Sequence, residues 1–174
     1  MTPRLAHIPV IRTERLTLRA MEARDWPAFR EFLQSPRAVH MGGPYDADAA
    51  WGMFCSDAAQ WGFYGYGGLV IDADERTVGQ VAIIKPPAWP QEELGWLLYD
   101  GEEGKGYAVE AARALRDWYY SAHPSPVRLV SYVGPENNAS AEVARRLSAM
   151  LADDLPVVDK GDLVFLHPAP ERLR

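Results

Sequence analysis

The segment from Glu93 to Tyr120 reads ELGWLLYDGEEGKGYAVEAARALRDWYY and runs from an apolar strand through a glycine-rich turn into a helix. Glycines in such a turn carry no Cβ, so an anion can approach the backbone, and the first turn of the helix presents unpaired N–H groups at the positive end of its dipole. The segment therefore predicts a strand–turn–helix unit that binds a diphosphate at Gly104, Lys105, Gly106 and Tyr107.

A glycine-rich turn alone is a weak signal, because many strand-to-helix turns carry glycine for steric reasons. A Walker loop needs four residues between its glycines and a Ser or Thr after its Lys, whereas Gly101 and Gly104 enclose two residues and Gly106 follows Lys105. The dinucleotide fingerprint is incomplete as well, since no third glycine closes it. Both of these common phosphate-binding motifs are excluded.

The loop EEGKGYAVEAA resembles the pyrophosphate loop of the GNAT acyltransferase superfamily, in particular the branch of the ribosomal-protein N-terminal acetyltransferases. Upstream, IRTERLTLRAMEARDWPAF at 11–29 is similar to the opening strand and helix of that branch, and GPENNASAEVARRL at 134–147 is similar to its second coenzyme segment. The resemblance implies an α/β (α+β) fold with a mixed, mostly antiparallel sheet of six to seven strands. About four helices flank this sheet, which splays between its fourth and fifth strands.

The length of 174 residues fits one domain, 1–174, with a core at about 11–168. No apolar stretch approaches the ~20 residues of a membrane helix, and the N-terminal segment, with His7, Pro9 and Arg12, lacks the apolar block of a signal peptide. We therefore expect a cytoplasmic protein that does not contact a membrane.

The net charge of −6 argues against a nucleic-acid partner, whose phosphates call for a basic surface, and is compatible with a cationic acceptor or with solubility alone. Cys55 is the only cysteine, which excludes an intrachain disulfide, and it has no clustered ligands for a structural zinc site. We expect Cys55 to be a small buried side chain, and we expect no metal.

Hydrophobic periodicity and turn residues predict alternating strands and helices. The strands are expected at 15–21, 69–71, 77–85, 92–99 and 127–133, and the helices between 25 and 36 and at 46–61, 106–120 and 137–151, followed by a closing hairpin of 156–159 with 163–167. An exposed apolar face on that hairpin is compatible with a homodimer.

The resemblance implies that acetyl-CoA is the cosubstrate and that Ala108 extends the loop at 104–107. It also implies that the pantetheine arm pairs with the strand backbone at Leu97, Leu98 and Tyr99, with a Leu98 N–H facing the thioester oxygen. Without the resemblance, this strand reads as an ordinary buried one. Asn137 matches the asparagine of the family that reaches the coenzyme, although Asn is also a strong helix N-cap and both roles stay open.

Direct attack by an amine needs a base and a proton donor for the departing thiolate, and no protein nucleophile. The resemblance implies Glu93 as the base, since the branch often has an acid where this strand opens, and Ser140, which matches a serine of the family, as the donor. The alternatives are a solvated carboxylate beside Glu92 and a capping or packing serine.

Several aromatic and polar residues border the expected acceptor pocket, and the sequence does not rank them: His40, Tyr45, Tyr64 and Tyr66. Trp51, Trp61 and Trp89 could enclose a cation, but we expect Trp51 and Trp61 in the core.

The chain departs from the family pattern at two places. Gly101 replaces a usual Arg or Gln, and Glu102 and Glu103 bring negative charge towards a diphosphate; Ser148 and Ala149 stand where glycine and an aromatic residue are common. The leading hypothesis is an enzyme that moves an acetyl group from acetyl-CoA to a primary amine, either a protein N-terminus or a small molecule. The alternative is a catalytically silent CoA-binding or interaction module on the same fold.

Overall fold

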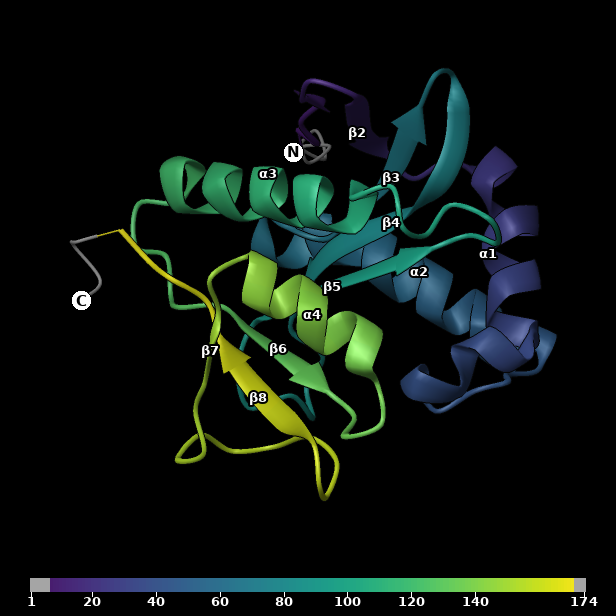
Figure 1. Cartoon of the computed structure of the whole chain (residues 1–174). Coiled ribbons are helices and arrows are strands. Elements are labelled where there is room, and N and C mark those ends of the chain that lie inside the picture. Colours follow the sequence, from purple (N-terminus) through teal and green to yellow (C-terminus); the bar gives the residue numbers. More distant parts are fainter. Residues whose placement is uncertain (1–6, 171–174) are drawn as a thin grey trace.

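The computed structural model describes residues 7–170 and shows one twisted sheet with helices on both faces (Figure 1). The strand order is β1-β2-β3-β4-β5-β6-β8-β7. The strands are β1 (Ile11–Arg12), β2 (Leu16–Ala20), β3 (Gly68–Ala73), β4 (Arg76–Ile84), β5 (Glu93–Leu98), β6 (Val130–Val133), β7 (Met150–Leu151) and β8 (Leu163–Leu166). The predicted mixed, mostly antiparallel sheet is confirmed, with two short edge strands added.

The only parallel neighbours in the described sheet, β5 and β6, separate almost at once. Their register consists of a single pair, Glu93 with Val130, while β5 continues to Leu98. Beyond this pair, the Ser131 hydroxyl donates to the carbonyl of Leu94 and lies 2.9 Å from Nε2 of the fully buried His167. Burial lowers the pKa of His167 to about 3, so the ring is neutral. The splay expected between the fourth and fifth strands is therefore present between the strands labelled β5 and β6.

The helices divide between the two faces of the sheet (Figure 1). On one face lie α3 (Tyr107–Ala122) and α4 (Asn138–Arg146), and on the other lie α1 (Trp26–Gln34) and α2 (Ala47–Tyr64). Two 3₁₀ segments flank α1, at Ala23–Asp25 and Pro36–Met41. Because β5 leads through α3 into the parallel β6, the crossover places the N-terminus of α3 above the end of β5.

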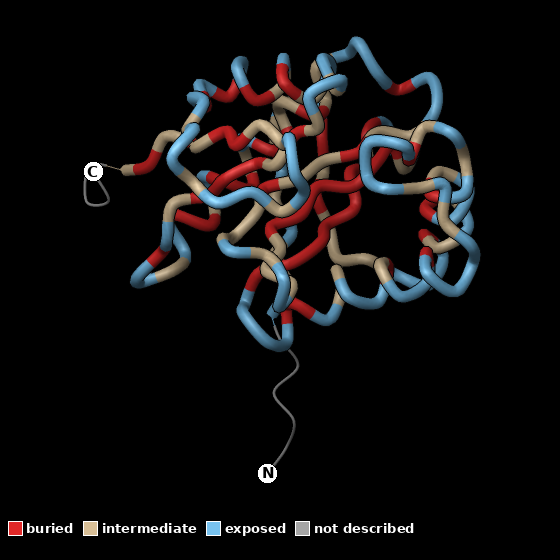
Figure 2. The backbone as a smooth tube through the Cα atoms, turned by 90° about the horizontal axis from the view of Figure 1, so that it is seen from below, coloured by how far each residue is buried: buried red, intermediate tan, exposed pale blue. Residues whose placement is uncertain are grey.

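The main core lies between α3 and the sheet (Figure 2). The small and apolar face of α3 is buried there, including Ala111, Ala112 and Leu115 with no exposed surface. A second cluster, in which Phe29, Phe54 and Leu97 take part, fills the space between β5 and the pair α1 and α2. Alternate residues of β5 therefore face opposite layers, as the period of a strand requires.

The structure corrects two element predictions near the C-terminus. The last helix ends at Arg146 instead of 151, because Leu147 caps it and Ser148 adopts φ +61°, a left-handed conformation that ends a helix. The expected hairpin partner at 156–159 is not a strand, and β8 pairs instead with β6 and β7. Ser148 thus holds a left-handed conformation that glycine, the residue the resemblance leads one to expect here, adopts without strain.

Two burial predictions were wrong. Cys55 is exposed on α2, and Trp51 is 47% exposed although its ring packs on Trp26 and Phe54. Trp61 is buried as expected. Helical spacing identified the apolar side of α2 but not which of its residues the sheet covers.

Candidate active site

The turn between β5 and α3 is curled by three glycines. Gly101, Gly104 and Gly106 have φ values of +77°, +77° and +81°, a region that favours glycine. The first intrahelical bond of α3 runs from the N–H of Glu110 to the carbonyl of Gly106, so the N–H groups of the first turn have no intrahelical acceptor. The predicted anion-binding geometry at 104–107 is therefore present in the backbone.

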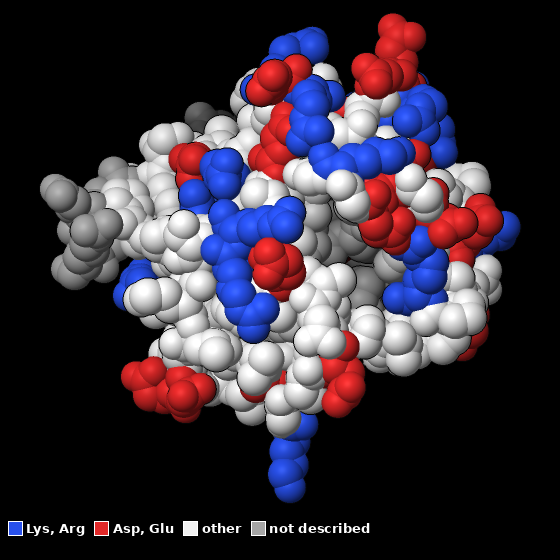
Figure 3. Space-filling view, in the orientation of Figure 1, with Lys and Arg blue, Asp and Glu red and all other residues white. Residues whose placement is uncertain are grey.

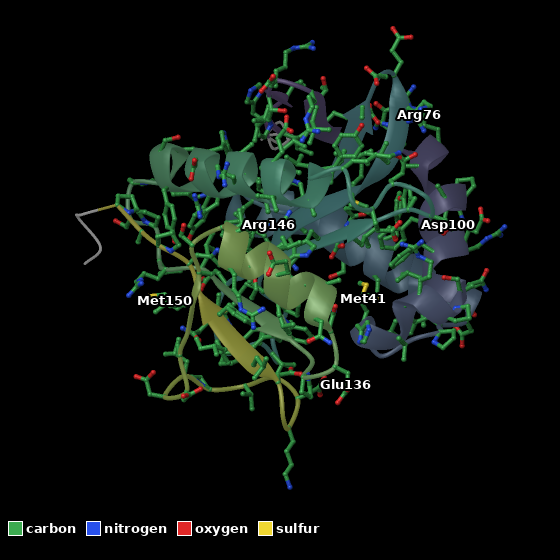
Figure 4. The ribbon with its side chains drawn as sticks, viewed as in Figure 1. Met41, Arg76, Asp100, Glu136, Arg146 and Met150 are labelled. Carbon is green, nitrogen blue, oxygen red and sulfur yellow. The ribbon has the colours of Figure 1, made fainter. Side chains whose placement is uncertain are left out.

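The acidic residues of this turn, which bring negative charge towards the diphosphate site, are paired with cations. The Glu102 carboxylate lies 2.8 Å from Lys105 Nζ and 2.7 Å from Arg76 Nη1, and these hydrogen bonds lower the pKa of Glu102. Arg37 pairs with Glu103 and with Asp100. Figure 4 labels Asp100 in this turn and Arg76 on the adjoining hairpin. The two carboxylates that the sequence flagged are thus locally neutralised.

Arg15 fixes the beginning of α3 from the neighbouring N-terminal segment. Its Nη1 donates to the carbonyl of Lys105 at 2.8 Å, and its Nε donates to Glu110 at 2.7 Å. The guanidinium also lies over the ring of Tyr107. These contacts hold the glycine turn in one conformation relative to β2.

A cavity of about 280 Å³ occupies the gap between β5 and β6 and opens between α4 and the segment of Met41. Figure 3 shows this face hollowed beside α4, and Figure 4 labels Met41 and Glu136 on the two sides of the opening. Its walls come from both layers, because residues 94–97 and 131–134 line it together with α2 and the start of α4. The cavity therefore connects the two faces of the sheet through the splay.

Along β5, the backbone N–H and C=O groups of successive residues point alternately to β4 and to the side of β6. The N–H of Tyr99 donates to Val78 on β4, and the carbonyl of Leu94 accepts from Ser131 on the side of β6. Residues of the same parity as Leu94, namely Trp96 and Leu98, therefore direct their amide groups into the splay. Of the three predicted residues, only Leu98 directs its amide groups into the splay. Leu97 and Tyr99 direct their amide groups to β4. Once the neighbouring strands were known, the same alternation would have identified Trp96 as a second residue whose amide groups face the splay.

Glu93 is enclosed by protein at the point where the strands diverge. Its carboxylate accepts from Trp89 Nε1 at 2.6 Å and from the backbone N–H of Tyr132. Burial raises the pKa of Glu93 to about 7 despite these hydrogen bonds. Its hydrogen bonds to Trp89 and Tyr132 disfavour the alternative of a solvated carboxylate beside Glu92. Glu93 lines the cavity and changes charge near neutral pH.

Sequence reasoning missed a second carboxylate of the cavity, that of the half-buried Asp57. It projects from α2 into the same cavity and accepts from Gln80 Nε2 at 2.6 Å. Burial raises the pKa of Asp57 to about 7, and the negative charge of Glu93 adds to this effect. A polar residue within the apolar spacing of α2 was the available signal, since an aspartate is seldom buried without a function or a partner.

On the side of α4, the cavity reaches Asn137 and Ser140. The side chain of Asn137 caps α4 by accepting the N–H of Ser140 at 3.1 Å, which confirms the capping role. Tyr132, which the sequence did not single out, also lines the cavity, and its buried hydroxyl has no hydrogen-bond partner among the described residues. Burial raises the pKa of Tyr132 to about 12, which keeps it protonated.

Of the predicted pocket-bordering residues, His40 and Tyr45 line the cavity. Tyr66 lies instead in the core against Tyr119, and Tyr64 stacks on Tyr66 outside the cavity. Trp89 lines the cavity as a hydrogen-bond donor to Glu93. The two tyrosines follow the end of α2, which turns them away from the splay.

Replacing Asp57 by asparagine is expected to stabilise the fold above pH 7. The folded pKa of about 7 exceeds the ordinary 3.8, so folding favours the protonated acid, and stability falls as the pH rises from about 4 to 7. Asparagine keeps an acceptor for Gln80 without the charge. Urea unfolding at pH 8 should show a gain of roughly 1–3 kcal/mol that shrinks towards pH 4. Asp48→Asn, at an exposed site on the same helix, should show no such pH dependence.

No group of three or more His, Cys, Asp or Glu residues within 7–170 is arranged to hold a metal ion. No helix in this described range is both long and apolar enough to cross a membrane.

A glycine cradle at a helix N-terminus, beside a cavity at a sheet splay, makes a site suited to a phosphate-bearing ligand that reaches into the cavity. Residues 15–149 match the family described as the acetyltransferase (GNAT) domain, and the chain belongs to this family of N-acetyltransferases, whose fold binds coenzyme A.

Among solved structures, an acetyltransferase from Agrobacterium tumefaciens strain C58 is 50% identical, with a TM-score of 0.89 over 92% of this chain and 95% of that one. The RimL ribosomal L7/L12 α-N-protein acetyltransferase, solved with coenzyme A, shares the fold at 18% identity and a TM-score of 0.73, covering 92% of this chain and 98% of its own. In sequence, the uncharacterized N-acetyltransferase YnaD of Bacillus subtilis strain 168 is 24% identical over 144 residues, 79% of this chain and 80% of YnaD.

Proposed function

We propose that this single-domain protein transfers the acetyl group of acetyl-CoA directly to a primary amine in the cytoplasm. The observation that carries the proposal is the position of Glu93. This carboxylate, with a pKa of about 7, lies in a cavity at the divergence of β5 and β6, within reach of the glycine cradle along β5. This position supports Glu93 as the base, at a point where a strand-like coenzyme arm and an amine could meet.

The coenzyme would be held mainly by backbone. The turn from Gly104 to Ala108 offers its N–H groups to the pyrophosphate, as a helix N-terminus does for phosphates generally. The amides of Trp96 and Leu98 that face the splay would pair with the pantetheine arm in place of the missing strand contacts. Leu97 packs beneath them, and Asn137 borders the arm while it caps α4.

In the reaction, the amine nitrogen bonds to the thioester carbon and the carbon–sulfur bond breaks. Glu93 accepts the proton that the nitrogen loses. Its raised pKa is closer to the pKa of an amine, about 10, than that of an ordinary carboxyl group, which makes this proton transfer less unfavourable. The Leu98 N–H stabilises the negative oxygen. Ser140, on the first turn of α4, supplies a proton to the sulfur, and the protonated Tyr132 hydroxyl is a second donor in the cavity.

The silent-module alternative is not favoured by any observation. That alternative rested on two departures from the family pattern, the acidic turn and the absence of glycine after α4. Glu102 and Glu103 are paired with cations, and Ser148 adopts the conformation that glycine would provide. Self-association remains part of the proposal, since Met150 and Leu151 are exposed on the edge strand β7.

The first test is calorimetric titration with acetyl-CoA of wild type and Gly104→Val. A Cβ at Gly104 meets no atom within 4 Å, so the fold accommodates the variant at the cost of a strained φ, while the branched side chain obstructs the anion site. We expect at least a tenfold loss of affinity, which is about 1.4 kcal/mol.

Gly65→Val is the matched control, because Gly65 has φ +75° and lies beside His123, at the opposite end of α3. It should bind acetyl-CoA like the wild type. Absence of binding by folded, coenzyme-free wild type would refute the proposed function.

A further inference from the structure

On the side of α2, the floor of the cavity includes Ala82 and Gly95. The row of small residues continues across the sheet to Gly68, which Met21, Asp57 and Gln80 cover. Gly68 on β3 pairs with Ala82 on β4, which pairs with Gly95 on β5. A Cβ added at Gly95 would meet no atom within 4 Å, so the space above it is open. The row spans two strand spacings, roughly 10 Å. Its part over Gly95 and Ala82 lines the cavity and forms a short trough that ends at Asp57.

A carboxylate stands at each end of this trough. A Cβ at Gly68 would come within 3.0 Å of Asp57 Cβ, which places Asp57 directly above that end. Glu93 lies two residues before Gly95, on the same face of β5, at the end that meets the splay. Both carboxylates line the one cavity, and each accepts a hydrogen bond from a neutral donor instead of a cation.

The rest of the cavity lining is also acidic. Asp159 and Asp162 line the cavity from the segment before β8, and no lysine or arginine within 7–170 does so. His40 is the only basic side chain of this lining. Two ionised carboxylates in such a space repel one another, and a positively charged group beside each removes that cost.

Resting on the proposed function, we propose that the acceptor is a small linear diamine, with its reacting nitrogen at Glu93 and its second ammonium at Asp57. The trough leads from the splay to Asp57 over residues with little or no side chain, so an unbranched alkyl chain fits between the two groups. The enclosed Asp57 end suits a compact ammonium more than a polypeptide, whose second residue would need room for backbone and side chain.

The test compares putrescine with aminobutanol, which has the same length and a hydroxyl in place of the second ammonium, with n-butylamine and a serine-initiated peptide alongside. In wild type, kcat/KM for putrescine should exceed that for aminobutanol roughly 10- to 100-fold, as expected for one charge-assisted hydrogen bond. Asp57→Asn should reduce this ratio to near unity. Asp48→Asn should keep it.

A second variant, Gly95→Val, narrows the trough at a position where an added Cβ meets no atom within 4 Å. It should raise KM for putrescine at least tenfold while acetyl-CoA titration still shows binding. Equal use of putrescine and aminobutanol, preference for the peptide, or an unchanged ratio in Asp57→Asn would overturn the diamine inference while turnover upholds the acetyltransferase. Binding of acetyl-CoA without turnover of any diamine would overturn it too, and loss of acetyl-CoA binding in wild type would remove the proposed function itself.

Discussion

Glu93→Gln is expected to lower kcat by roughly 100- to 10,000-fold, the contribution typical of a general base. Glutamine preserves the size of the side chain and an acceptor for Trp89 Nε1, so the cavity should keep its shape. Acetyl-CoA affinity should change little, because the coenzyme cradle lies at the other end of β5. Steady-state kinetics with a saturating amine, together with calorimetry, separate these two quantities.

The pH dependence gives the same prediction an independent readout. With a pKa of about 7, Glu93 is protonated in acid, so wild-type kcat/KM should fall about tenfold per pH unit below 7 and level off above it. Asp57 and Asp162 are the other acids near Glu93, and both raise its proton affinity when ionised. Glu92→Gln, which changes the adjacent carboxylate outside the cavity, should retain the wild-type rate. An acid limb that survives in Glu93→Gln would assign the base elsewhere.

Gly79→Ala is expected to destabilise the fold by about 3 kcal/mol, the upper range for overpacking. A Cβ at Gly79 would lie 2.2 Å from the carbonyl oxygen of Leu97 and 3.0 Å from Cα of Leu98. These are backbone atoms of the paired strand, so β4 and β5 would have to separate. For a chain of this length, the melting temperature should drop by roughly 6–12 °C.

Gly52→Ala is the matched comparison, since Gly52 lies within α2 and a Cβ there meets nothing within 4 Å. It should stabilise the protein by roughly 0.5–1 kcal/mol, because alanine is the better helix former. Urea denaturation of both variants tests the pair, and a similar small change in each would contradict the close approach of β4 to β5.

The order of strands and helices, the glycine turn and the splay were all predictable, because each depends on local periodicity or on the resemblance of contiguous motifs. Glu93 was also found from its place at the start of a strand. Its enclosure by Trp89 and Tyr132 was not predictable, since both partners come from segments whose position depends on the tertiary fold.

Asp57 was missed for a related reason. Its importance arises from Gln80, which lies on another element, and from Gly68, whose missing side chain leaves room for it. The overlong last helix has a different cause: Ser148 is an unexceptional helix residue by propensity, and only its left-handed φ ends the element. Non-local partners and single backbone conformations are the parts that sequence patterns do not encode.

The passage through the sheet at the divergence of β5 and β6 separates the approaches of the two reactants. In the proposed reaction, the coenzyme would enter over α3 and α4 and the amine from the layer of α1 and α2, so neither would have to leave before the other could arrive. Such an arrangement imposes no order of binding by obstruction, and each product can depart on the side from which its precursor came. Free CoA in the cell would then compete with acetyl-CoA for one entrance only, and access of the amine would be unaffected.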